Sequence, residues 1–184
     1  DVVIASRKQE ACEALAEEVE KETGRRALPV ACHVGEWDQC DALVETAYAH
    51  FGRVDIWVNN AGMSPLYPSL PEVSEALWEK VIGVNLKGPF RLMALVATRM
   101  AEGEGGSIIN IGSMSGHRVP AGSNGMYCAT KFAVRALTET FRQELHAKNR
   151  PVRICEISPG LVETGFAAHY GGSEDAAEKT YGAF

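Results

Sequence analysis

The segment from Gly112 to Lys131, GSMSGHRVPAGSNGMYCATK, holds a tyrosine and a lysine whose spacing suits proton transfer. Tyr127 and Lys131 stand one helical turn apart, so in a helix they share a face. An ammonium group at that distance favours the phenolate and lowers the pKa of a tyrosine below its usual value of about 10. We therefore expect Tyr127 to act as a general acid or base near neutral pH.

A serine hydroxyl beside this tyrosine can hold a substrate oxygen, and two serines compete for that place. Ser113 follows the apolar run SIINI almost directly, whereas Ser115 lies farther into the loop. The position just past a strand favours Ser113. The Tyr-x-x-x-Lys spacing alone also fits an ordinary surface pair on a helix, so the residues around it must decide.

The rest of the sequence alternates between short apolar runs and amphipathic stretches. Such alternation is typical of an α/β protein, a doubly wound parallel sheet of the Rossmann type in three α/β/α layers. We expect one domain over 1–184, whose ligands lie outside the carboxyl ends of its strands. The expected strands are 2–5, 27–33, 54–58, 107–111 and 152–157, and the expected helices are 8–23, 36–51, 71–101 and 125–148, with a weakly helical substrate-loop region at 165–184.

Composition narrows the class of protein. A net charge of −6 with no long Lys/Arg run argues against a nucleic-acid partner. The most apolar stretch, 90–100, is interrupted by Arg91 and Arg99, so we expect no membrane span. The histidines lack metal-binding spacings, and we expect no metal site. Without any CxxC pair, the cysteines are expected to be reduced core residues of a cytoplasmic protein: Cys12, Cys32, Cys40, Cys128 and Cys155.

Asn85 stands in the predicted helix at 71–101, one helical turn before Pro89. Because proline has no N–H group, the backbone carbonyl of Asn85 loses its usual helical partner. We expect the helix to kink near Asn85 and to free this carbonyl for a water molecule. Alternatively, Pro89 merely starts a second helical segment, which frees the same carbonyl by another route.

Further motifs surround these residues in a fixed order. NNAG at 59–62 ends a strand, GVNLKGPF at 83–90 contains Asn85, INIGSMSG at 109–116 contains Ser113, and SPGLVET follows at 158–164. In this order and spacing, the chain resembles the classical short-chain dehydrogenase/reductase family along essentially its whole length.

This resemblance implies roles for the matched residues. Tyr127 would be the acid/base, Ser113 would polarise the substrate carbonyl, and Lys131 would bind the nicotinamide ribose. Asn85 would hold a water in a proton relay. The residues that the resemblance assigns to the dinucleotide are Ser6, Arg7, His33, Val34, Asn60, Ala61, Gly62, Tyr127, Lys131, Pro159, Gly160, Val162 and Thr164.

The choice of dinucleotide depends on the residues after the strand at 2–5. An acidic residue there favours NAD(H), whereas an arginine accommodates the 2′-phosphate of NADP(H). This sequence has Arg7 followed by Lys8, with no acid at the strand end. A planar guanidinium binds phosphate in a bidentate manner. The pair also fits a solvated helix start, but we expect NADP(H) rather than NAD(H).

The sequence departs from the family at both ends. No glycine-rich turn of the type TGxxxGIG occurs before Asn59, and no strand follows the last helical region. We expect the first βα unit and the last strand to be missing here. Two functions remain open: an NADP(H)-dependent carbonyl reductase or alcohol dehydrogenase, and a truncated non-catalytic member that does not bind dinucleotide. The resemblance further implies a small-molecule carbonyl or alcohol substrate and a homo-oligomer, a dimer or tetramer.

Overall fold

Strands and helices alternate along the computed structural model, which describes residues 1–119, 125–164 and 166. The predicted substrate-loop region at 165–184 lies outside the described residues, apart from Phe166. The elements in chain order are β1 (Val2–Ser6), α1 (Gln9–Thr23), β2 (Ala27–Ala31), α2 (Trp37–Phe51), β3 (Ile56–Asn59), η1 (Leu70–Glu72), α3 (Glu75–Ile82), η2 (Gly83–Lys87), α4 (Gly88–Glu102), β4 (Gly106–Ile111), η3 (Met114–Gly116), α5 (Gly125–Ala147) and β5 (Val152–Ile157).

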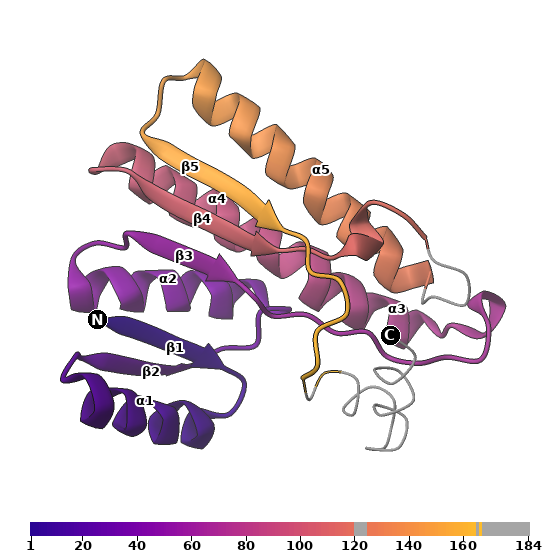
Figure 1. Cartoon of the computed structure of the whole chain (residues 1–184), viewed down its shortest axis with the longest axis horizontal. Helices are drawn as coiled ribbons and strands as arrows, with labels where there is room; N and C mark the ends of the chain where they lie inside the picture. Colours follow the sequence, from indigo (N-terminus) through magenta and orange to yellow (C-terminus); the bar gives the residue numbers. More distant parts are fainter. Residues whose placement is uncertain (120–124, 165, 167–184) are drawn as a thin grey trace.

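The strands pair in parallel and form two groups (Figure 1). One group is β1–β2, and the other has the order β3–β4–β5. Strands β1 and β3 are not hydrogen-bonded to each other within the described part of the chain. Parallel pairing brings the carboxyl ends of the strands to one edge, which is where the predicted site residues follow. The predicted parallel α/β class is therefore confirmed.

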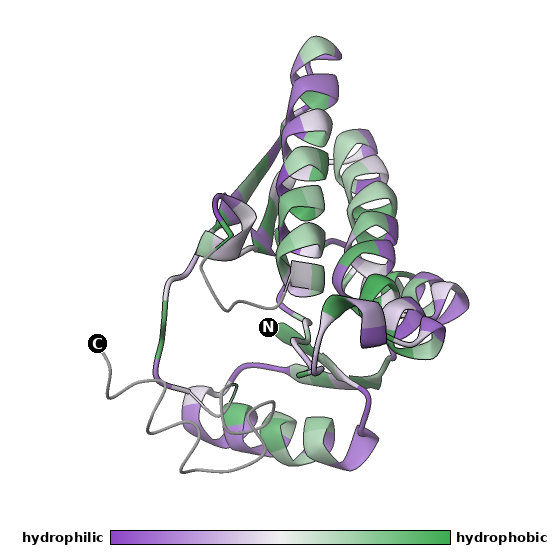
Figure 2. Cartoon of the chain, turned by 90° about the vertical axis from the view of Figure 1, so that its right-hand side faces the viewer, coloured by the Kyte–Doolittle hydropathy of each residue, from purple (hydrophilic) through white to green (hydrophobic). Residues whose placement is uncertain are grey.

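Helices cover both sides of the strands. Helix α4 packs against α2 and α5, and α5 also packs against β5. Helix α1 packs on β1 and β2, and it lies across these strands from α2 in both Figure 1 and Figure 2. This arrangement confirms the predicted three layers.

The largest core cluster joins both groups of strands to the covering helices. Met93, Val96 and Met100 of α4 and Ile108 of β4 are almost wholly buried in it. The helical stretch 75–102 is long and apolar enough to cross a membrane, but 44% of its most apolar window is buried inside the protein. This stretch therefore serves as a core helix in the described structure.

Two helices end at glycines, at the boundaries that the sequence predicts. Gly24 after α1 and Gly52 after α2 take left-handed conformations with φ of 66° and 76°. Their N–H groups bond to Glu20 and Tyr48 carbonyls in the last turn. Because L-residues with a side chain rarely adopt this conformation, these two positions favour glycine.

The cysteine prediction holds for four of the five thiols. Cys12, Cys32, Cys40 and Cys128 are buried, as expected for small apolar residues. The prediction is wrong for Cys155, which is exposed. Alternate side chains of β5 point to opposite sides, and Cys155 lies on the side away from the buried residues.

Candidate active site

Ser113, Tyr127 and Lys131 come together at the carboxyl end of β4. Ser113 caps η3, and its Oγ accepts a hydrogen bond from the Ser115 amide at 3.1 Å. The hydroxyl of Tyr127, in the first turn of α5, is hydrogen-bonded to Ser113. Lys131, one turn later, places its Nζ 5.6 Å from the centroid of the Tyr127 ring. The structure thus groups these three residues as the spacing predicts, and it pairs Tyr127 with Ser113 rather than Ser115.

Burial governs the electrostatics of this group. Burial raises the pKa of Tyr127, and the hydrogen bond from Ser113 only partly opposes that shift. Burial also lowers the pKa of Lys131 to about 8. The expectation that Lys131 brings the tyrosine pKa below its ordinary value is therefore not met here. The Lys131 ammonium donates to the Ile111 carbonyl at 2.7 Å, and burial of the phenol is the largest cause of the raised Tyr127 pKa.

Asn85 lies in the π-helical turn η2, between α3 and α4. Pro89 falls in the first turn of α4, so it starts a second helical segment as the alternative expects. A kink near Asn85 stays a prediction. The Asn85 side chain bonds to both backbone groups of Met63 at 2.8 Å and to Thr130 Oγ1 at 3.1 Å. This side chain therefore ties the loop after β3 to α5. That its backbone carbonyl holds a water stays a prediction.

The NNAG segment leaves β3 beside this group. Asn60 and Ala61 are exposed. A Cβ atom added to Gly62 would lie 3.7 Å from Lys131 Nζ and 3.8 Å from Asn85 Oδ1. Gly62 therefore lies beside the Lys131 ammonium, within ordinary van der Waals range of it.

The segment after β5 approaches the group from the other side. The Pro159 carbonyl accepts a hydrogen bond from the Met114 amide at 2.9 Å, and Gly160 lies against the Met114 sulfur. Val162 is 56% exposed, and Thr164 is exposed with its Oγ1 accepting from the Phe166 amide. Thus Pro159 and Gly160 are held next to η3, whereas Val162 and Thr164 continue along an open stretch.

The remaining predicted cofactor residues follow β1 and β2. The Ser6 carbonyl accepts from the Cys32 amide at 2.8 Å. The His33 amide donates to Gln39 at 2.8 Å, and Val34 packs tightly against Gly88. Arg7 is exposed and forms no ion pair with the carboxylates of the described residues. Ser6, Arg7, His33 and Val34 form a second group, at the same edge of the strands as the first.

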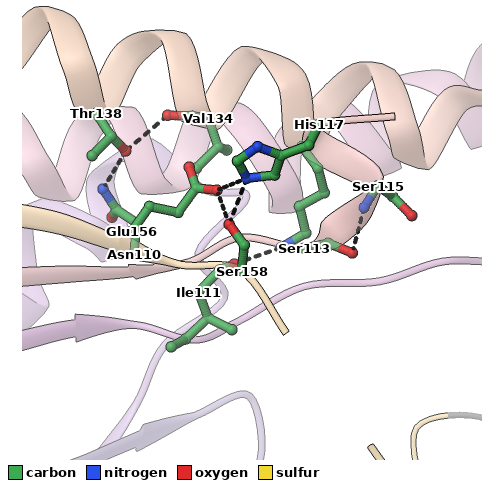
Figure 3. A network of polar contacts seen from close by, with 10 residues as sticks. Asn110, Ile111, Ser113, Ser115, His117, Val134, Thr138, Glu156 and Ser158 are labelled. Carbon is green, nitrogen blue, oxygen red and sulfur yellow. Dashed lines mark hydrogen bonds and ion pairs between the residues drawn. The ribbon is translucent and has the colours of Figure 1, made fainter. Parts of the chain in front are cut away.

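A buried amide chain beneath the site was not predicted. Asn59 Nδ2 donates to Asn110 Oδ1 at 2.8 Å, and Asn110 Nδ2 donates to Thr138 Oγ1 at 2.8 Å. Figure 3 shows Asn110 of β4 pointing toward Thr138 of α5. The available signal was an asparagine inside the apolar run SIINI, because a buried amide needs partners. These hydrogen bonds link β3, β4 and α5 below the Ser113–Tyr127 pair.

The fold and the site together define a parallel α/β protein with a Ser–Tyr–Lys group at the carboxyl edge of its strands. A family model described as short chain dehydrogenase matches residues 1–175. The chain therefore belongs to the short-chain dehydrogenase family, as the sequence motifs predict.

Known proteins agree with this assignment. An uncharacterized oxidoreductase of Staphylococcus saprophyticus is 38% identical over 83% of this chain and 62% of its own length. An alcohol dehydrogenase from Thermococcus sibiricus, solved with 5-hydroxy-NADP, has a TM-score of 0.82 and 27% identity over 98% of this chain and 78% of its own. A Burkholderia phymatum short-chain dehydrogenase/reductase, solved with NAD, has a TM-score of 0.81 and 30% identity over 95% of this chain and 62% of its own. The chain spans about three-fifths of the length of the curated relatives it matches.

Proposed function

We propose that the protein carrying this chain is an NADP(H)-dependent oxidoreductase that interconverts a carbonyl compound and a secondary alcohol. The observation that carries the proposal is the hydrogen bond between the hydroxyls of Ser113 and Tyr127, with buried Lys131 one turn later. Two donors so placed can act on one substrate oxygen. The family supports the reaction class, and the two neighbours solved with NAD or an NADP derivative support a dinucleotide cofactor.

In this proposal each side chain has one task. Ser113 holds and polarises the substrate oxygen. Tyr127 gives its proton to that oxygen during reduction and takes it back during oxidation. Lys131 holds positive charge beside the phenol, and Asn85 holds a water of the proton relay. A bound nicotinamide cofactor supplies or accepts the hydride.

The cofactor would lie along the carboxyl edge of the strands. Its nicotinamide end would meet Tyr127, Lys131 and the segment from Pro159 to Thr164, and its adenosine end would meet the group after β1 and β2. Two observations fit this placement: Gly62 lies beside Lys131 Nζ, and the exposed guanidinium of Arg7 forms no ion pair with the carboxylates of the described residues. The described residues contribute no glycine-rich phosphate turn.

Arg7 decides the preference for NADP(H) in this proposal. We expect Arg7→Ala to raise the KM for NADPH at least about tenfold, because it removes a charge-assisted contact to the 2′-phosphate. The KM for NADH should stay within about twofold, since NADH lacks that phosphate. Steady-state kinetics with both cofactors checks this. Arg26→Ala is the matched control, because Arg26 pairs with Asp1 at the opposite end of β1. Equal losses with the two cofactors would remove Arg7 from the phosphate site.

The serine assignment can be tested in the same way. We expect Ser113→Ala to lower kcat about a hundredfold or more, because Tyr127 and the substrate oxygen both lose a partner. Ser115→Ala should keep kcat within about twofold, since only the Ser115 backbone amide bonds to Ser113. Full turnover in S113A together with loss in S115A would reverse the assignment.

A panel of ketones, aldehydes and secondary alcohols, assayed with NADPH and NADH, tests the proposed function itself. NADPH-dependent reduction of a carbonyl by the protein carrying this chain is the expected result. The alternative, a non-catalytic member that folds without dinucleotide, predicts no turnover and no NADPH fluorescence change on titration.

A cytoplasmic location and a homo-oligomeric state complete the proposal. Light scattering tests the oligomer, although Leu92, Val96 and Val134 already serve the core of the single chain.

A further inference from the structure

A glutamate stands on the buried side of β5. Side chains alternate along a strand, so Glu156 shares its side with Val152 and Ile154, which are 8% and 6% exposed. This side packs against α5. The Glu156 side chain is only 9% exposed. A carboxylate is rarely buried to this extent unless other groups compensate its charge.

The hydrogen bonds of Glu156 account for one of its two carboxylate oxygens. Ser158 Oγ donates to Oε1 at 2.7 Å, and His117 Nε2 lies 2.9 Å from Ser158 Oγ and 3.9 Å from Glu156 Oε1. Figure 3 shows the three side chains pointing toward one another beneath α5. The other oxygen, Oε2, is buried and has no hydrogen-bond partner among the described residues. The hydrogen bond from Ser158 therefore satisfies only one carboxylate oxygen. A neutral partner alone does not explain why a charged group is buried here.

The chain leaves room for this carboxylate at the end of β4. A Cβ atom on Gly112 would lie 2.1 Å from Glu156 Oε1, so only glycine lets the carboxyl group come this close. Gly112 directly follows Ile111, whose carbonyl accepts the hydrogen bond from Lys131 Nζ. The carboxylate and the ammonium thus approach neighbouring peptide units of one strand end.

Lys131 needs a compensating charge in this place. Its side chain is 5% exposed, and burial shifts its pKa down to about 8. The negative charge of Glu156 opposes that shift. The other titratable groups nearby are His117 after η3 and, on α5, Tyr127 and Cys128. The loop after β3 contributes Gly62 and η2 contributes Asn85, and neither residue is charged.

We propose that Glu156 is a positioning residue whose buried carboxylate keeps Lys131 charged at the end of β4. This role rests on the proposed function, in which the Lys131 ammonium assists Tyr127. In this proposal Glu156 acts through Lys131 and takes no direct part in the reaction. Its function is to keep a larger fraction of Lys131 protonated near neutral pH, because burial alone disfavours the ammonium.

The test titrates Lys131 directly. The protein carrying this chain is labelled with [13Cε]lysine, the Lys131 signal is assigned with Lys131→Met, and its chemical shift is followed from about pH 5 to about pH 11. Glu156→Gln removes the charge and keeps a side chain of equal size. We expect this variant to lower the Lys131 midpoint by about one pH unit. The high-pH limb of kcat/KM should move down equally, while kcat/KM near pH 7 changes less than about threefold.

Two further variants separate charge from structure. Glu156→Asp, which keeps the charge, should restore most of the midpoint, and Ser158→Ala, which removes only the hydrogen bond, should leave it near the wild-type value. If E156Q does not fold, Glu156→Met, uncharged and of similar volume, repeats the measurement. An unchanged Lys131 midpoint in the uncharged variant overturns the proposal. Because the titration needs no turnover, it gives its answer even if the panel shows no oxidoreductase activity, which would contradict the proposed function alone.

Discussion

Replacing Tyr127 by phenylalanine is expected to lower kcat by about a thousandfold or more. The substitution removes a single oxygen, which the proposed mechanism uses to exchange a proton with the substrate oxygen. General acid–base catalysis of this kind contributes about 10²–10⁴ to a rate. The remaining Ser113 hydroxyl can still polarise the substrate, so the KM should change far less than kcat. Steady-state kinetics with the best substrate of the carbonyl panel measures both constants.

The loss of activity should occur in a folded protein. Y127F leaves Ser113 without one hydrogen-bond partner, which costs about 1 kcal/mol of stability. Tyr48→Phe is the matched control, because the Tyr48 hydroxyl on α2 is buried without a partner among the described residues. This control should keep full activity and equal or greater stability. If Y127F retains more than about a tenth of the wild-type kcat, Tyr127 is not the acid/base.

Local sequence patterns predicted the fold because each strand and helix carries its own signal. Gly24 and Gly52 mark helix ends through their backbone freedom, and apolar runs such as SIINI mark buried strands. Parallel pairing then follows from the alternation of these elements, and it brings their carboxyl ends to one edge. The grouping of Ser113 with Tyr127 could be predicted for the same reason, since one follows β4 and the other opens the next helix.

What the sequence could not predict depends on contacts between distant segments. The chain from Asn59 through Asn110 to Thr138 joins two strands and a helix, and no local pattern pairs these residues. The spacing to Lys131 predicts a lowered pKa for Tyr127, but burial, which the sequence does not show, raises it. The role of Glu156 cannot be predicted from the apolar run at 152–157, because only the structure shows that its side chain lies on the buried side.

Replacing Lys131 by methionine is expected to lower activity at least about a hundredfold and yet to stabilise the protein at pH 7. Met has a similar length and needs no counter-charge in an apolar site. Because the pKa of Lys131 falls from 10.5 to about 8, the charged ammonium destabilises the folded protein by at most about 3 kcal/mol. The loss of the hydrogen bond to the Ile111 carbonyl reduces the stability gained by K131M by about 1 kcal/mol. The free energy of unfolding of K131M should therefore still exceed that of the wild type at pH 7.

The sign of the pH dependence makes this prediction specific. Between pH 8 and 10.5 the unfolded chain binds more protons at Lys131 than the folded chain, so wild-type stability rises with pH across this interval. The advantage of K131M should therefore be largest below pH 8 and shrink as the pH approaches 10.5. Urea denaturation at pH 7 and pH 10 measures both differences, and Lys80→Met, at an exposed lysine of α3, should show no such trend. An advantage that stays constant over this range would show that Lys131 titrates with the same pKa in the folded and unfolded chains.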